Sequence, residues 1–304
     1  MKKRELGKSG LFASEIGLGC MSLPTNNVEA QKIVDAAIDH GITYFDTADL
    51  YDKGENEVVV GHALKGKRQN ILLATKVGNK WREDEAGWTW DSSSSYITKQ
   101  VKESLTRLQT DYIDLYQLHG GTMEDNLEEA VDAFESLKKE GLIRAYGISS
   151  IRPNVVNRFL AKDQASSVMM QYSMLDRRPE EWFELIAGHG ASVVTRGSLA
   201  KGLLTAEVMK RVEDSKGYGE YSKELLLETL SKIGKHTEDL TSLALAFVLQ
   251  HKQVAAIVAG ASSEKQITST IDAYHRSIST NDLEQVTNLL RDDRYKEHRK
   301  IGLN

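Results

Sequence analysis

The chain has 304 residues, 40% of them hydrophobic and 27% charged, which is the composition of an ordinary globular protein. Its 44 acidic and 39 basic residues give a net charge of −5, which argues against a broad nucleic-acid or anionic-membrane surface. The one cysteine, Cys20, excludes an intramolecular disulfide, and no apolar run suits a secretory signal or a membrane span. We therefore expect a cytoplasmic protein.

A KSG turn within residues 1–14 predicts a small hairpin ahead of the main fold. After it, short apolar runs alternate with stretches of helical spacing. The predicted strands cover residues 16–20, 42–46, 71–76, 113–119, 143–149, 167–171, 192–196 and 254–259. The predicted helices lie near 29–40, 56–65, 95–108, 126–140, 153–161, 180–188, 223–234 with 239–251, and 263–275.

Eight strands that are each followed by a helix predict an α/β fold of the (β/α)8 TIM barrel type. A further amphipathic segment at 281–293 predicts an extra C-terminal helix. A doubly wound sheet is the alternative, but the segment GLGCMS lacks the third glycine of a dinucleotide fingerprint. No linker divides the chain, so we expect residues 1–304 to form a single barrel domain.

Asp46, Lys76 and His119 each end a predicted strand, and Tyr51 lies in the loop after the first of these strands. Each residue alone has a structural explanation as a turn cap, a solvated amine or a core histidine. Catalytic groups of a barrel gather at the C-terminal ends of its strands, where all four would meet. The sequence therefore favours an active site at that rim.

These four residue types suit the protonation of a carbonyl oxygen. A free tyrosine has a pKa of about 10, but a nearby ammonium group stabilises the phenolate and a carboxylate keeps that ammonium charged. A histidine can hydrogen-bond the reacting oxygen. No side chain donates hydride, so a redox cofactor is implied.

The motifs resemble those of the aldo-keto reductase family over nearly the whole chain. The segment DTADLYDKGENEVVVGHAL resembles the family pattern DTA-x-x-Y-x-x-x-E-x-x-x-G, and ILLATK matches the strand that ends in the family lysine. RLQTDYIDLYQLH, residues 107–119, follows R-L-x-x-D-Y-I-D-L-Y-x-x-H. The resemblance implies a barrel that reduces aldehydes or ketones to alcohols with NADPH.

The resemblance also implies roles for individual residues. Tyr51 would be the general acid, assisted by Lys76 and Asp46, and His119 would orient the carbonyl. The positions that match the cofactor site are Gly19, Cys20, Met21, Asp46, Ser149, Gln171, Arg196, Ser198, Leu199, Gly202, Gly260, Ser262, Ser263, Lys265, Gln266 and Thr270.

Several positions depart from the family pattern. Ser150 replaces a frequent Asn, and Arg196 stands where many members stack an aromatic residue on the nicotinamide. Ser198 replaces a common proline. At the adenine end, Gln266 replaces a frequent Arg, and Thr270 replaces a frequent Asn or Glu. Ser262, Ser263 and Lys265 still predict a phosphate site at a helix N-terminus, and hence NADPH rather than NADH. The alternative is an ordinary helix cap with a solvated lysine.

The segment 77–94 is predicted to be a loop and holds Trp81, Trp88 and Trp90, which either wall a substrate pocket or pack the loop against itself. Trp81 is the expected substrate contact, together with Tyr51 and His119. The loop 206–222 either clasps the cofactor or is an ordinary surface connection. We expect a small carbonyl compound as substrate, no nucleic-acid or membrane partner, and a monomer or weak oligomer.

Two other functions are compatible with parts of the pattern. A protein of the same fold could sense the redox state of the nucleotide and regulate a partner without turnover, and the intact set of four residues argues against this alternative. A metal-dependent hydrolase would use Asp46 and His119 as ligands, but the predicted strand ends offer no second histidine or close carboxylate cluster, so no metal is expected.

Overall fold

A computed structural model of the protein describes residues 1–82, 86–237 and 239–299. Its centre is a closed barrel of eight parallel strands that pair in sequence order, and β14 closes the ring against β3, with Ile257 opposite Ile16. The strands are β3 (Ile16–Gly19), β4 (Tyr44–Asp46), β5 (Leu72–Val77), β8 (Ile113–His119), β9 (Ile143–Ser149), β10 (Ser167–Gln171), β11 (Ser192–Arg196) and β14 (Val254–Gly260). The predicted (β/α)8 barrel is confirmed.

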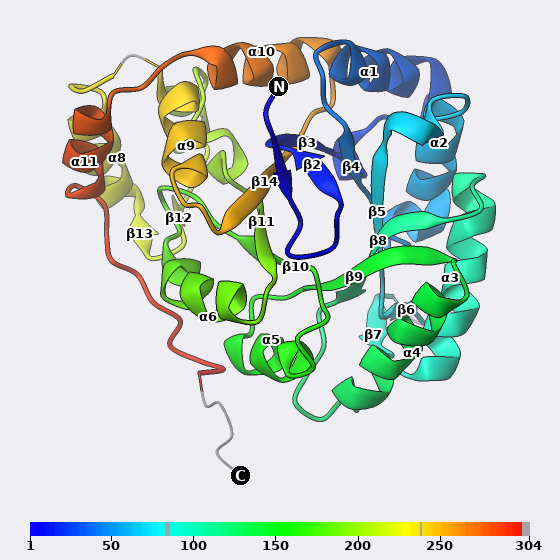
Figure 1. The fold of residues 1–304 in the computed structure, drawn as a ribbon. Helices are drawn as coiled ribbons and strands as arrows, with labels where there is room; N and C mark the ends of the chain where they lie inside the picture. Colours follow the sequence, from blue (N-terminus) through cyan, green and yellow to red (C-terminus); the bar gives the residue numbers. More distant parts are fainter. Residues whose placement is uncertain (83–85, 238, 300–304) are drawn as a thin grey trace.

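Helices surround the barrel (Figure 1). They are α1 (Asn27–Asp39), α2 (Glu55–Ala63), α3 (Ser94–Leu108), α4 (Leu127–Lys139), α5 (Pro153–Leu160), α6 (Phe183–Gly188), α7 (Val208–Glu213), α8 (Lys223–Ile233), α9 (Leu240–Leu249), α10 (Glu264–His275) and α11 (Thr280–Thr287). Short 3-10 turns occur at η1 (Cys20–Ser22), η2 (Tyr51–Gly54), η3 (Arg68–Asn70), η4 (Arg178–Trp182) and η5 (Ala200–Gly202). The extra C-terminal helix is confirmed, but α11 ends at Thr287 and is shorter than the predicted span of 281–293.

Polar side chains fix where the helices begin. The hydroxyl of Ser93 accepts a hydrogen bond from the backbone N–H of Tyr96 and so caps α3. Ser263 caps α10 in the same way through the N–H of Gln266. At the other ends of α1 and α4, Gly41 and Gly141 take positive φ angles of 87° and 77°, a conformation that glycine adopts without strain.

The barrel has two apolar layers. The inner one is made of strand side chains such as Leu115, Met169 and Val194, and the hairpin β1 (Lys3–Glu5) with β2 (Phe12–Ser14) adds Leu6 and Ala13 to it. The hairpin therefore covers the N-terminal end of the barrel (Figure 1). The active-site candidates lie at the opposite end.

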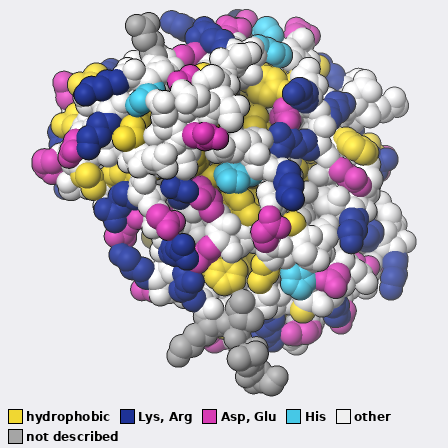
Figure 2. All heavy atoms as spheres, turned by 60° about the vertical axis from the view of Figure 1, so that its left-hand side comes forward, with side chains coloured by type: hydrophobic (Ala, Val, Ile, Leu, Met, Phe, Trp, Pro, Cys, Tyr) yellow, Lys and Arg dark blue, Asp and Glu magenta, His cyan; other side chains and the backbone are white. Residues whose placement is uncertain are grey.

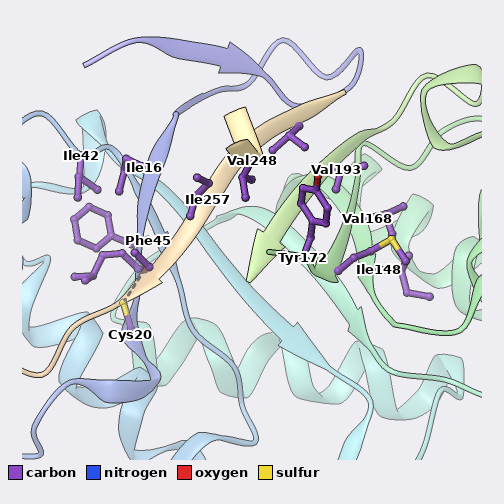
Figure 3. Close-up of a cluster of buried hydrophobic side chains, with 14 of the residues drawn as sticks. Ile16, Cys20, Ile42, Phe45, Ile148, Val168, Tyr172, Val193, Val248 and Ile257 are labelled. Carbon is purple, nitrogen blue, oxygen red and sulfur yellow. Dashed lines mark hydrogen bonds between the residues drawn. The ribbon is translucent and has the colours of Figure 1, made fainter. Parts of the chain in front are cut away.

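The outer layer packs the strands against the surrounding helices. Figure 3 shows part of this layer, which includes Ile16, Phe45 and the fully buried Cys20. Burying apolar surface stabilises the fold by about 25 cal/mol per Å². This layer fixes the strand ends, and so it fixes the side chains that they carry.

The two long connections contain structure that the sequence analysis did not predict. The segment 77–94 forms an antiparallel hairpin of β6 (Asn79–Trp81) and β7 (Trp88–Trp90), and 206–222 holds α7 and a second hairpin of β12 (Gly217–Tyr218) and β13 (Tyr221–Ser222). The prediction of plain loops was wrong because strands of two or three residues carry too short a pattern to be recognised.

Figure 2 shows basic and acidic side chains interspersed over one face of the molecule. In the part of the chain that the structure describes, no helix combines the length and the apolar character needed to cross a membrane.

Candidate active site

Asp46, Tyr51, Lys76 and His119 meet at the C-terminal end of the barrel. Asp46 ends β4, His119 ends β8, and Lys76 lies near the end of β5 between them. Lys76 forms an ion pair with Asp46, and its Nζ lies 3.4 Å from the hydroxyl of Tyr51. The structure therefore brings all four predicted residues into one cluster.

Lys76 is the centre of this cluster. It is 1% exposed, and besides its ion pair it donates to the backbone carbonyl of Thr47 at 2.8 Å. Burial works against its charge, but Asp46 and Tyr51 outweigh this effect and raise the pKa of Lys76 above its ordinary value. Burial raises the pKa of Asp46, and the ammonium of Lys76 opposes that shift. The ammonium is thus charged and held in one direction.

His119 lies beside the phenol. The two rings meet edge to face with centroids 6.1 Å apart, and the buried Nδ1 atom of His119 has no hydrogen-bond partner among the described residues. Burial, together with the positive charges of Lys76 and Arg196, lowers the pKa of His119 to about 3. The imidazole is therefore neutral at physiological pH, and it can donate one hydrogen bond to a carbonyl oxygen.

Tyr51 is carried by a turn rather than by a strand. It begins η2, in which Asp52 and Lys53 have φ angles of 49° and 56° and Gly54 has a φ of 93°. Left-handed backbone at a non-glycine residue costs about 1–3 kcal/mol and persists only when its surroundings hold it. The turn is followed at once by α2, whose buried Glu57 is paired with Arg107 of α3 at 2.7 Å.

The segment after β3 holds three of the predicted cofactor residues. Gly19 ends the strand and Met21 is 62% exposed, so both lie where a ligand can reach them. Cys20 differs, because it is 0% exposed and its thiol donates to the carbonyl of Leu18 at 3.7 Å. Cys20 therefore belongs to the core, and its carbonyl already accepts from the side chain of Asn56 at 2.8 Å.

The next group follows the ends of β9, β10 and β11. Ser149 is buried and its carbonyl accepts from the N–H of Gly120 at 2.9 Å. The amide of Gln171 is used at both ends: it donates to Asp176 at 2.9 Å and accepts from Arg196 at 3.1 Å. Arg196 is exposed and makes no ion pair within the described residues.

The loop after β11 contains Ser198, Leu199 and Gly202. The hydroxyl of Ser198 is buried and bonds to Thr195 at 3.0 Å, so it is part of the loop's own support. Ala200, Lys201 and Gly202 all have positive φ angles, of 47°, 57° and 88°. The N–H groups of Ala200 and Gly202 donate within the loop, to the carbonyls of Gly197 at 2.9 Å and Leu199 at 2.8 Å, and so hold this conformation.

The last group lies between β14 and α10. Gly260 ends β14, and the side-chain carbonyl of Gln266 accepts from both the N–H and the hydroxyl of Ser262, at 2.8 and 3.1 Å. Ser263 is the cap, and Lys265 is exposed in the first turn. Thr270 is 7% exposed and its hydroxyl bonds within the helix to the carbonyl of Gln266 at 3.0 Å.

These residues fit a nucleotide phosphate. The donors around Ser262 already point at one oxygen, that of Gln266, and the helix N-terminus and the ammonium of Lys265 favour an anion there. Thr270 is the exception, since its hydroxyl is occupied inside α10.

The tryptophans of the hairpin β6–β7 divide between packing and the site. Trp88 and Trp90 contact each other with centroids 5.2 Å apart, and the guanidinium of Arg152 lies 4.5 Å from the ring of Trp90. A Cβ at Gly120, the residue after His119, would lie only 2.5 Å from the indole nitrogen of Trp90. The hairpin β6–β7 therefore packs closely against the backbone at Gly120, next to His119.

Trp81 lies beside the turn that carries Tyr51. It is half-buried, and its ring lies 5.4 Å from the ammonium of Lys53, a residue of η2. Among the residues that the structure describes, its buried indole nitrogen has no hydrogen-bond partner. The contact with Lys53 therefore joins the hairpin β6–β7 to the turn of Tyr51.

The sequence analysis missed two functional contacts. Gln117 donates from Nε2 to the second carboxylate oxygen of Asp46 at 3.1 Å, and Arg107 supports the turn of Tyr51 through Glu57. The alternation of β8 contained a signal for the first, because Gln117 shares the barrel-facing side of the strand with His119. No local pattern pointed to the second.

The sequence profile described as the aldo/keto reductase family matches residues 15–291. The chain belongs to this family, and it is an oxidoreductase of the aldo-keto reductase type. It is 49% identical to the uncharacterised oxidoreductase YqkF of Bacillus subtilis over 98% of this chain and 100% of that protein.

Two further relatives bear on the cofactor. The solved holo form of aldo-keto reductase AKR11C1 from Bacillus halodurans is 49% identical, covers 99% of this chain and 100% of its own, and superposes with a TM-score of 0.92. The protein named aldo-keto reductase yakc [NADP(+)] of Schizosaccharomyces pombe is 32% identical over 66% of this chain and 62% of its own.

Proposed function

We propose that the protein reduces aldehydes or ketones to alcohols with NADPH, and that Tyr51 protonates the carbonyl oxygen. The observation that carries this proposal is the hydroxyl of Tyr51, 3.4 Å from the buried ammonium of Lys76. That ammonium is directed by Asp46 on one side and by the carbonyl of Thr47 on another.

Each residue of the cluster then has one task. Tyr51 donates its proton to the carbonyl oxygen of the substrate as that oxygen gains negative charge. The ammonium of Lys76 stabilises the phenolate that remains, and Asp46 balances the charge of Lys76. His119, being neutral, orients the carbonyl by donating a hydrogen bond, while Trp81 forms an apolar wall.

A nicotinamide cofactor supplies the hydride when it is bound. The residues that would hold it follow the strand ends from β9 to β14, with Ser149, Gln171 and Arg196 on the nicotinamide side. The loop of Ser198, Leu199 and Gly202 would cover the pyrophosphate. The 2′-phosphate would be held by Ser262, Ser263, Lys265 and Gln266. The ribose region would be lined by Gly19 and Met21. These assignments rest on the family resemblance and on the hydrogen-bond donors present.

The test is turnover with a panel of reactive aldehydes and ketones, using NADPH and NADH side by side. Wild-type protein should oxidise NADPH, and Tyr51→Phe should lose turnover while its affinity for NADPH, measured by quenching of tryptophan fluorescence, stays unchanged. Full activity in Tyr51→Phe would show that another group donates the proton. Binding of NADPH without turnover of any carbonyl would instead favour a redox-sensing module.

Cofactor choice has its own variant. Lys265→Ala should raise the KM for NADPH by about tenfold, the loss expected for one charge-assisted contact, and leave the KM for NADH unchanged. Lys252→Ala is a matched control, because it removes an exposed lysine at the opposite end of β14. An equal rise for both cofactors would place Lys265 away from the 2′-phosphate.

A further inference from the structure

Gln117 lies inside the barrel directly beneath the catalytic cluster. It is 0% exposed, and in the register of β5 and β8 it is the partner of Lys76. Its Nε2 donates to the Oδ2 atom of Asp46 at 3.1 Å, although the two residues are 71 positions apart in the chain. A polar amide at a fully buried position carries a desolvation cost, so the bond that it makes matters to the fold or to the site.

The carboxylate of Asp46 is divided between two donors. Lys76 binds Oδ1 and Gln117 binds Oδ2, and in the described part of the chain these are the two side chains that donate to it. Asp46 is itself only 3% exposed, so water does not replace a missing donor. With both oxygens occupied, the carboxylate plane is fixed, and the direction of the Lys76 ammonium is fixed with it.

We propose that Gln117 is a positioning residue of the active site: by holding Oδ2 of Asp46 it keeps that carboxylate ionised and keeps Lys76 aimed at Tyr51. This inference rests on the proposed function, in which Tyr51 is the proton donor. Gln117 touches neither the reacting carbonyl nor Tyr51. It acts through Asp46.

Other groups near Asp46 do not take over this role. Tyr44 points from β4 into the inner layer and lies close enough to Asp46 to interact with it, but among the described residues its hydroxyl makes no hydrogen bond of ordinary length and angle. Burial and the charge of Asp46 raise the pKa of Tyr44 well above its usual value, so the phenol is neutral. Cys20 is likewise neutral, because burial raises the pKa of its thiol. Arg196 acts on Asp46 through its charge alone.

Two variants of similar size separate positioning from packing. Gln117→Met removes the donor and keeps the length of the side chain. We expect kcat to fall by about 10- to 100-fold, the effect of one hydrogen bond to a charged group, with little change in KM. Because the hydrogen bond favours the ionised carboxylate, its loss makes Asp46 take up a proton at higher pH. In the plot of kcat against pH, the fall of kcat on the acidic side should therefore occur at higher pH than in the wild type.

Gln117→Glu gives the opposite pH dependence. At low pH the protonated side chain still donates to Asp46, whereas at high pH two carboxylates would compete for one ammonium. The ratio of variant to wild-type kcat should therefore fall as pH rises, while for Gln117→Met the same ratio should rise. Tyr116→Phe is the matched control. It removes, from the neighbouring position on the outward side of β8, a buried hydroxyl that has no partner in the described part of the chain, and it should leave kcat unchanged.

All variants are compared by circular dichroism, by NADPH affinity and by kcat from pH 5 to pH 9, next to Tyr51→Phe. Wild-type kcat in Gln117→Met, or pH profiles of both variants parallel to wild type, would overturn the inference. If Gln117→Met does not fold, the profile of Gln117→Glu decides alone. Loss of activity in Tyr51→Phe with none in the Gln117 variants would refute the role of Gln117 only, whereas full activity in Tyr51→Phe would refute the proposed function.

Discussion

The ion pair between Glu57 and Arg107 should respond unequally to the removal of its two partners. The side chain of Glu57 is 0% exposed, whereas that of Arg107 is 22% exposed. Arg107→Leu leaves a carboxylate in the core, and among the described residues the side chain that still donates to it is Thr75, whose hydroxyl lies at 2.5 Å. Stranding a buried charge in this way costs about 3–5 kcal/mol of unfolding free energy.

The reverse change is milder. Glu57→Gln leaves Arg107 partly solvated and retains an oxygen for Thr75, so we expect a loss of about 1–2 kcal/mol. The double variant should be more stable than Arg107→Leu alone, because it no longer buries an unpaired charge. Urea unfolding followed by circular dichroism measures all four proteins. A double variant less stable than Arg107→Leu would refute the reasoning.

Three further predictions concern single residues. His119 binds its proton with a pKa of about 3 when folded and about 6.5 when unfolded, so the folded state should lose stability relative to His119→Gln as pH falls from 7 to 4, measured by urea unfolding at each pH. Gly120→Ala should raise KM and lower stability by displacing Trp90, and more so than Gly141→Ala, which has a similar positive φ but open space around it. Equal effects would show that the backbone conformation alone matters. Because burial raises the pKa of Cys20, its thiol should resist iodoacetamide in the native protein and react after unfolding in urea, as followed by mass spectrometry.

The barrel was predictable because each of its strands lies in a mostly apolar run of at least five residues, even where the strand itself, such as β4, is shorter. The meeting of Asp46, Tyr51, Lys76 and His119 was predictable for a related reason, since three of them end such runs and the rim of a barrel brings strand ends together. Local sequence patterns do not show which residues from distant parts of the chain will contact each other across the barrel. The bond from Gln117 to Asp46 and the approach of Trp90 to Gly120 depend on strand register and on the hairpin β6–β7.

Cys20 illustrates a second limit. The predicted strand 16–20 includes this residue, but β3 ends at Gly19, and the turn η1 directs the thiol into the core. Strand alternation predicts facing only while the strand continues. Residues one or two positions past a strand end are therefore predicted less well than those within it.

The cluster combines rigid and adjustable parts, and this division decides which distant residues matter to it. Asp46, Lys76 and His119 stand on paired strands, whereas Tyr51 stands on a turn whose next residues are in the left-handed region. That turn is held where Gly54 packs against Arg107, since a Cβ at Gly54 would lie 2.9 Å from the Cδ of Arg107. Arg107, which neutralises Glu57, thus also supports the turn of Tyr51, the proposed proton donor. Arg107→Leu should consequently lower kcat as well as stability, whereas variants that break ion pairs elsewhere on the surface should lower neither.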